Sequence, residues 1–102
     1  MFNESFESFQ ARKLSEGFDE VLVRNWDPHF SNSMHEHPFD TEALVAKGEF
    51  WLTMDGKTAH YQKGDVFKVP RGAMHCEQYG PDGAEFWAAR KSGSKRDDRS
   101  GT

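Results

Sequence analysis

Two histidines separated by a single residue, His35 and His37, have the spacing of a metal-binding pair. In a β-strand, residues two apart point to the same face, so both imidazoles can reach one ion. Imidazole suits zinc, iron, nickel and copper, and additional oxygen ligands extend the choice to manganese. Short histidine pairs also occur on protein surfaces, and two histidines alone make a poor site. A third ligand must therefore come from another part of the chain.

His75 is the candidate for that third ligand, at the start of an expected strand 38 positions after His37. A sheet that closes on itself could bring the two segments together. Glu77 lies two residues after His75, so strand parity points its carboxylate to the same face. There it could bind the metal, support a ligand from behind or act as a catalytic general base. The alternative is that Glu77 reaches solvent at the rim.

The elements that must position these residues are short strands with turns between them. Asp55-Gly56 is a strong hairpin signal, because a type I′ turn needs two residues that tolerate positive φ. No segment between residues 20 and 90 has sustained helical periodicity, so the pattern favours an all-β sandwich or barrel. The expected strands are Glu20–Trp26, Thr41–Ala46, Glu49–Met54, Lys57–Gln62, Val66–Val69, Met74–Tyr79 and Ala84–Arg90, with a turn at Gly80-Pro81-Asp82-Gly83 before the last.

The ends of the chain are expected to lie outside this all-β body. The length of 102 residues fits a single domain. Residues 1–19 form an N-terminal segment, and its polar sequence with phenylalanines fits either a short helix or an edge strand. Residues 91–102 contain no apolar side chain to bury and are expected to be a disordered polar tail. The folded domain is thus expected over residues 20–90.

Charge and composition exclude several classes of partner. The net charge of the chain is −4, and the tail carries more basic than acidic residues, so the body is more negative than the whole chain. The body therefore lacks the basic surface that nucleic acid or an anionic membrane requires. Cys76 is the only cysteine, so no disulfide can form within the chain. No apolar run reaches the ~20 residues needed to span a bilayer. These features favour a cytoplasmic protein that binds neither nucleic acid nor membranes.

The spacing around His75 resembles the second motif of the cupin family, G-x5-P-x-G-x2-H-x3-N. Gly64, Pro70, Gly72 and His75 occupy their places with every interval correct, and Tyr79 stands where the family has asparagine. The turn at Pro70-x-Gly72 ends one strand and reverses the chain tightly. It thereby places His75 at the mouth of the next strand.

The segment around His35 and His37 is similar to the first cupin motif, G-x5-H-x-H-x(3 or 4)-E-x6-G. Gly48 is in register with both histidines, whereas His29 stands where the motif begins with glycine. The resemblance covers about residues 20 to 90. It implies a single-domain, RmlC-like jelly-roll β-barrel in which three histidines hold one divalent metal ion inside the barrel.

The position of the family glutamate is the main departure. Thr41 stands there when the motif is counted back from Gly48, and Glu42 fits the longer spacing after His37. A β-bulge could turn Glu42 inward as a fourth ligand, with Asp40 as another oxygen candidate. Otherwise Glu42 faces outward, and water completes a site of three histidines.

The resemblance implies a metal-dependent enzyme, either dioxygenase-like or an isomerase or lyase, that acts on a small organic molecule inside the barrel. The ion would be iron, zinc, manganese or nickel, and Glu77 is the candidate catalytic residue. The alternative is a non-catalytic module that binds metal or a small molecule, similar to the sensor cupins of transcription factors. The small core and the aromatic content also suggest a homodimer.

Overall fold

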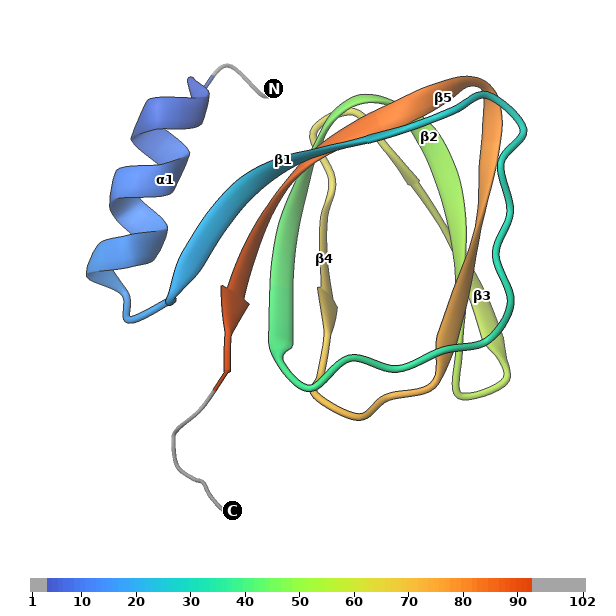
Figure 1. Ribbon diagram of the computed structural model, residues 1–102. Coiled ribbons are helices and arrows are strands. Elements are labelled where there is room, and N and C mark those ends of the chain that lie inside the picture. Colours follow the sequence, from blue (N-terminus) through green and yellow to red (C-terminus); the bar gives the residue numbers. More distant parts are fainter. Residues whose placement is uncertain (1–3, 93–102) are drawn as a thin grey trace.

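The computed structural model describes residues 4–92, which form one helix and a strongly curved antiparallel sheet (Figure 1). The elements are α1 (Phe6–Ser15), β1 (Glu20–Trp26), β2 (Asp40–Met54), β3 (Lys57–Gln62), β4 (Val66–Val69) and β5 (His75–Lys91). The N-terminal segment is a helix rather than an edge strand. The tail expected to be disordered lies almost entirely outside the described residues, and within these residues no helix has the length and hydropathy needed to cross a bilayer.

Two long strands, β2 and β5, pair with each other along nearly their whole length and curl to enclose the interior. The second part of β5 and the first part of β2 lie in one wall, with β1 and β4 beside them. The first part of β5 and the second part of β2 lie in the other wall, next to β3. The all-β, jelly-roll fold class expected from the sequence is confirmed.

Each long strand was expected as two strands, and in both cases the structure has one strand with a bend. The β2–β5 register shifts between Val45 and Lys47 and again between Gly48 and Phe50. Gly48 lies against Gly83 of β5, since a Cβ on Gly48 would meet the Gly83 carbonyl oxygen at 2.1 Å. The sequence signals at Gly48 and at residues 80–83 therefore mark a common corner of the barrel, not reversals of the chain.

The interior between the two walls is filled largely by aromatic rings. Phe50 packs on Tyr79 at 5.4 Å between ring centroids and on Phe67 at 5.0 Å. Rings bury large areas, so they compensate for a chain with few aliphatic residues. The buried inner cluster consists of Ala43, Val45, Phe50, Leu52, Phe67, Val69, Tyr79, Ala84, Phe86 and Ala88.

Helix α1 covers the outer face of the wall that contains β1. Ser5 caps the helix by accepting a hydrogen bond from the Ser8 amide, as N-cap serines do. Phe9 packs against Trp87 of β5, with 5.8 Å between the ring centroids. The helix therefore buries apolar side chains on the outer face of the sheet that would otherwise be exposed. It contributes no residue to the buried inner cluster.

Candidate metal centre

His35 and His75 lie directly opposite each other on neighbouring segments. The His35 amide donates to the His75 carbonyl at 2.8 Å, and the His75 amide donates back at 2.9 Å. Paired residues of this kind carry their side chains on the same face. The segment before β2 forms only isolated bridges with β5, so His35 and His37 lie in an irregular segment along the barrel mouth and not in the strand geometry used to argue their shared face.

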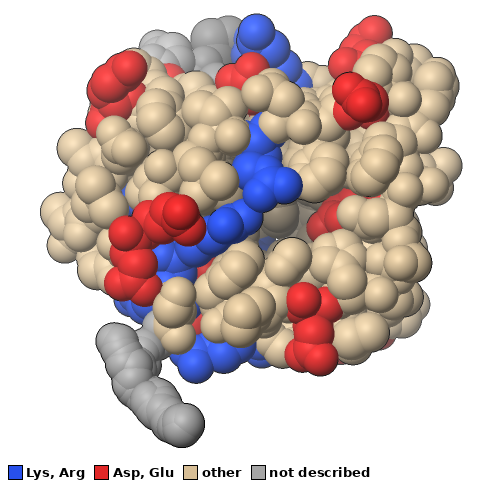
Figure 2. Space-filling view, in the orientation of Figure 1, with Lys and Arg blue, Asp and Glu red and all other residues tan. Residues whose placement is uncertain are grey.

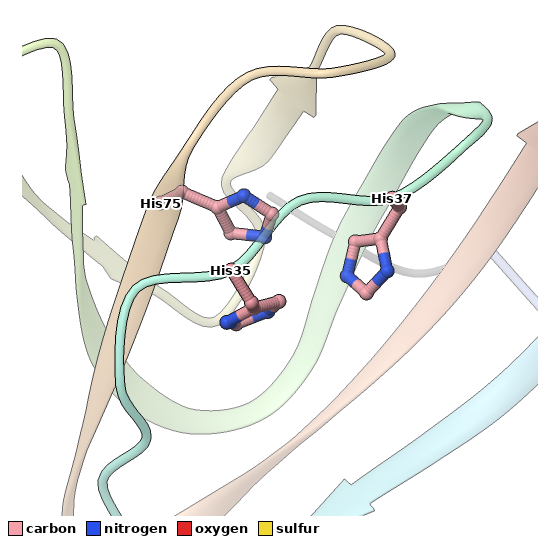
Figure 3. Close-up of side chains that lie close together, drawn as sticks. All are labelled: His35, His37 and His75. Carbon is pink, nitrogen blue, oxygen red and sulfur yellow. The ribbon is translucent and has the colours of Figure 1, made fainter.

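The three predicted histidines converge on one space (Figure 3). Their ring centroids are 4.3 Å apart for His35 and His75, 4.9 Å for His35 and His37, and 5.2 Å for His37 and His75. One nitrogen from each ring lies within 4.8 Å of the other two. Nitrogens bound to one ion at ~2.1 Å are about 3–3.5 Å apart. A small rotation of the side chains that brings the nitrogens closer by about 1.5 Å would therefore complete a three-histidine site.

In two of the three imidazoles, backbone carbonyl groups fix which ring nitrogen carries the hydrogen. Nδ1 of His35 lies 2.8 Å from the Ser33 carbonyl oxygen, and Nδ1 of His75 lies 2.8 Å from the Ala73 carbonyl oxygen. A carbonyl can only accept, so each Nδ1 carries the hydrogen and each Nε2 keeps its lone pair in the neutral ring. Such contacts orient metal-ligating histidines in general. They make both Nε2 atoms available as ligands.

Glu77 lies beside these free nitrogens and not at a solvent-exposed rim. Its carboxylate is 3.4 Å from Nε2 of His75 and 3.9 Å from Nε2 of His35, and its side chain is only 11% exposed. Asn32 Nδ2 donates to Glu77 Oε1 at 2.6 Å, which fixes the carboxylate in this place. With both imidazoles neutral, lone pairs of nitrogen and oxygen face each other with no hydrogen between them. A cation at this point would relieve that repulsion.

The carboxylates proposed to replace the family glutamate both point elsewhere. Glu42 faces the outer side of β2 and pairs with Lys13 of helix α1 at 2.5 Å, so the expectation that Glu42 binds the metal is wrong. No bulge lies beside Glu42, because the register from Asp40 to Val45 is regular. Asp40 accepts a hydrogen bond from the Arg71 amide at 2.7 Å. Thr41 is the residue that lines the interior.

A cavity of about 90 Å³ extends from the histidines into the barrel. Its polar lining includes Asn32, Glu77, Arg24 and Arg90. Arg90 was not predicted as a site residue, although the alternation that turns Phe86 and Ala88 inward also turns Arg90 inward. Two arginines thus line the same cavity as the histidine cluster.

His37 has the clearest electrostatic perturbation of the cluster. Burial lowers the pKa of His37 below its ordinary value, and the positive charges that His35, His75 and Arg90 can carry lower it further. Glu77 opposes this effect by attraction. Its ring also stacks on Phe39, with 4.9 Å between the centroids. These surroundings favour the neutral imidazole, which is the form that binds metal.

The remaining residues with chemical potential lie outside the cluster. Cys76 is absent from the lining of the histidine cavity and lines a second depression, which Asn32 and Glu77 also border. His60 is exposed, stacks on Trp51 and contacts Glu49 at 2.7 Å. Tyr79 is buried in the core, and burial raises the pKa of its hydroxyl well above the ordinary value. None of these side chains contributes to the histidine cluster.

Comparison with known proteins agrees with this architecture. Residues 22–78 match the family model described as "Cupin domain". A segment of 36 residues is 42% identical to an uncharacterized HTH-type transcriptional regulator of Haemophilus influenzae, covering 35% of this chain and 12% of the regulator. The chain thus spans only a small part of the length of the curated relative that it matches.

Two solved structures illustrate the similarity of the fold. The cupin domain of Cnp3 from Schizosaccharomyces pombe is 16% identical, with a TM-score of 0.68, and the match covers 91% of this chain and 61% of that chain. A structure from a study of the DMSP lyases RdDddP and RnDddQII is 20% identical, with a TM-score of 0.67, and the match covers 76% of this chain and 40% of that chain. At these identities the likeness concerns the fold alone.

Proposed function

Because this chain belongs to the cupin family, we propose that it binds one divalent metal ion through His35, His37 and His75 and acts on a small organic molecule held in the cavity. One observation carries the proposal. Nε2 of His75 and the carboxylate of Glu77 face each other at 3.4 Å, with the Nδ1 hydrogen of His75 already given to a carbonyl. A metal ion bound to Nε2 would satisfy the lone pair of the nitrogen and attract the neighbouring carboxylate, which stays available to a substrate.

A bound divalent ion would supply Lewis-acid activation of an oxygen atom of the substrate. Glu77 can then take a proton from the substrate or return one to it, since its Oε1 is held by Asn32 while Oε2 points toward the histidines. Proton transfer beside an activated oxygen is the step that isomerases and lyases share. It favours that half of the sequence-based expectation, and dioxygenase-like chemistry stays a prediction that depends on iron.

Metal content tests the binding part of this proposal. Protein produced without a histidine tag should contain close to one metal ion per chain, measured by elemental analysis. Replacing the buried ligand, His75→Ala, should abolish this content. His60→Ala is the matched control, because His60 is exposed on the outside of the barrel and should leave the stoichiometry unchanged. Retention of one ion per chain in H75A would refute the site.

Proton exchange tests the catalytic part. Metal-loaded protein in D₂O should exchange the α-protons of small carbonyl or hydroxy compounds, followed by ¹H NMR. Glu77→Gln keeps the size of the side chain and its hydrogen bond to Asn32 but cannot take up the proton, so exchange should stop. Glu42→Gln, on the outer face, should exchange like the wild type. Equal exchange by E77Q would remove Glu77 from the mechanism.

The similarity to an HTH-type transcriptional regulator favours one second candidate, a non-catalytic module that binds a metal or a small molecule. Such a module would bind the ion with the same stoichiometry but would catalyse no exchange. The catalytic and the non-catalytic function therefore differ in turnover, not in the metal site.

The homodimer expected from the sequence is likewise a proposal, and light scattering of the purified protein would measure it.

A further inference from the structure

We propose that the cavity selects a small organic acid, with Arg24 binding its carboxylate and Arg90 adding positive charge to the same cavity, while the rest of the molecule faces the histidines. This inference deepens the proposed function and rests on it for the reaction, but the binding of the acid can be measured separately. It begins from the placement of two arginines in a small, half-apolar interior. A guanidinium group forms two parallel hydrogen bonds with a carboxylate, which gives both affinity and orientation.

Arg24 lines the cavity and has no acidic partner in the part of the chain that the structure describes. It lies in β1 on the inward side, in register with Phe86, and its Cζ is 4.9 Å from the centre of the Trp26 ring. Among residues 4–92, no carboxylate forms an ion pair or a hydrogen bond with it. Stacking on an aromatic face uses the face of the guanidinium and leaves its N–H edges free. Those edges are the part that binds a carboxylate.

Arg90 reaches the same cavity from β5. Its Cζ is 4.5 Å from the centre of the Phe39 ring, so it is also held by stacking. Among the described residues its one acidic contact is with Glu20 at 3.5 Å, and the Glu20 side chain is 59% exposed. An exposed carboxylate at this distance neutralises a guanidinium only weakly. Arg90 therefore keeps most of its capacity to bind an anion.

The charge of the cavity favours an anionic occupant. Among the lining residues, the two arginines oppose the single carboxylate of Glu77, so the fixed charge is +1 with neutral histidines. A divalent ion at the histidines would raise it to +3. Figure 2 shows lysine and arginine side chains in a band across one face of the molecule, reaching the hollow at its centre. The weak screening in a small interior strengthens this attraction.

The rest of the lining limits what the anion can be. Phe67, Val69 and Ala88 supply an apolar wall. A water needs about 10–15 Å³ of such space, so a cavity of about 90 Å³ holds a molecule of roughly six to nine non-hydrogen atoms. The rings of Trp26 and Phe39 also line the cavity. These features fit a short-chain carboxylic acid.

Binding of butyrate, which has six heavy atoms, tests this inference against its uncharged counterpart butyramide. Metal-free protein is used first, because a carboxylate can also bind a metal directly. Chemical-shift titration should show that butyrate binds and that butyramide binds at least about tenfold more weakly. Arg24→Gln should weaken butyrate about tenfold or more, as expected for losing a charge-assisted hydrogen bond, and Arg90→Gln should weaken it less, through the loss of one positive charge. Arg71→Gln, an exposed control, should bind like the wild type.

The possible results separate the two proposals. Failure of the wild type to bind butyrate overturns the inference, as does butyramide binding of equal strength. Butyrate binding that is unchanged in R24Q also overturns it. Zinc binding is measured on the same proteins and should remain near one ion per chain in both arginine variants. Absence of zinc binding in the wild type would refute the metal site. The proposal that arginine binds the acid would still be decided by the butyrate titrations alone.

Discussion

Asn32 and Glu77 hold each other through two hydrogen bonds although they are 45 residues apart in the chain. Asn32 Nδ2 donates to Glu77 Oε1 at 2.6 Å, and the Glu77 amide donates to Asn32 Oδ1 at 2.7 Å. The asparagine thus binds both the backbone and the carboxylate of the same residue. It fixes the irregular segment before β2 to the strand that carries His75, and it aims the carboxylate at the metal site.

Asn32→Leu should loosen this connection while leaving the histidines in place. The free energy of unfolding should fall by about 1.5–3 kcal/mol, the range for hydrogen bonds to charged groups, measured by urea denaturation of metal-free protein. Asn25→Leu, at an exposed position of β1, should cost much less. The zinc stoichiometry of N32L should stay at one. A stability equal to that of the wild type would show that the pair contributes little to the fold.

Glu42→Gln should affect stability and not the metal site. Lys13 is almost fully buried, so removing the charge of Glu42 leaves its ammonium group, among the described residues, with only the Glu16 carboxylate, at 3.2 Å and 44% exposed. The loss should be about 1–3 kcal/mol, because Glu42 is 25% exposed and part of the interaction is screened. Glu36→Gln, between the two mouth histidines, is the control with unchanged stability. Reduced zinc affinity in E42Q would contradict the outward orientation of Glu42.

The lowered pKa of His37 predicts a pH dependence of stability for the metal-free protein. The unfolded chain has a histidine pKa near ~6.5, and the folded value is lower, so the unfolded state binds more protons as the pH falls. The contribution of His37 is complete above pH ~6.5 and is lost as the pH falls through the folded pKa. Urea midpoints at several pH values, with a chelator present, should fall less steeply for His37→Gln. Parallel curves for the two proteins would contradict this.

The corner glycine Gly83 should tolerate no side chain. Its φ is +69°, and a Cβ would lie 2.2 Å from the Trp26 carbonyl oxygen. Gly56 in the hairpin has a similar φ of +74° but open space around it, so Gly56→Ala measures the backbone strain alone, about 1–2 kcal/mol. Gly83→Ala should cost at least about twice as much by thermal or urea denaturation. Equal losses in the two variants would mean that the corner can relax.

The sequence predicted correctly the elements that depend only on local residue signals and on the alternation of side chains along a strand. β1, β3 and β4 have the predicted ends, and Asp55-Gly56 forms the expected turn with positive φ at both residues. The convergence of His35, His37 and His75 was anticipated from their spacing. Their same-face orientation, however, comes from a bridge opposite His75 and not from a strand through His35 and His37. The prediction was correct in outcome and incomplete in its geometry.

The remaining differences come from contacts that no local pattern contains. Gly80-Pro81-Asp82-Gly83 has the composition of a chain reversal, and only the pairing of Gly48 with Ala84 shows that it bends a continuous strand. Glu42 satisfied the motif spacing, but a buried lysine from a helix 29 residues earlier draws it outward. Arg90 was not predicted to face inward because the bend changes the alternation of inward and outward residues in β5. Its direction therefore cannot be obtained by counting along the strand from His75.

The corner at Gly48 and Gly83 has a consequence for how the two ends of the interior are linked. Before it, the odd-numbered residues of β5, such as His75 and Glu77, face inward; after it, the even-numbered ones, such as Phe86 and Arg90, do. The corner therefore changes which residues of β5 face inward, from odd-numbered before it to even-numbered after it. An insertion or deletion of one residue there would turn the guanidinium of Arg90 out to solvent while the imidazoles kept their place, so catalysis and selectivity could diverge through a change in spacing alone.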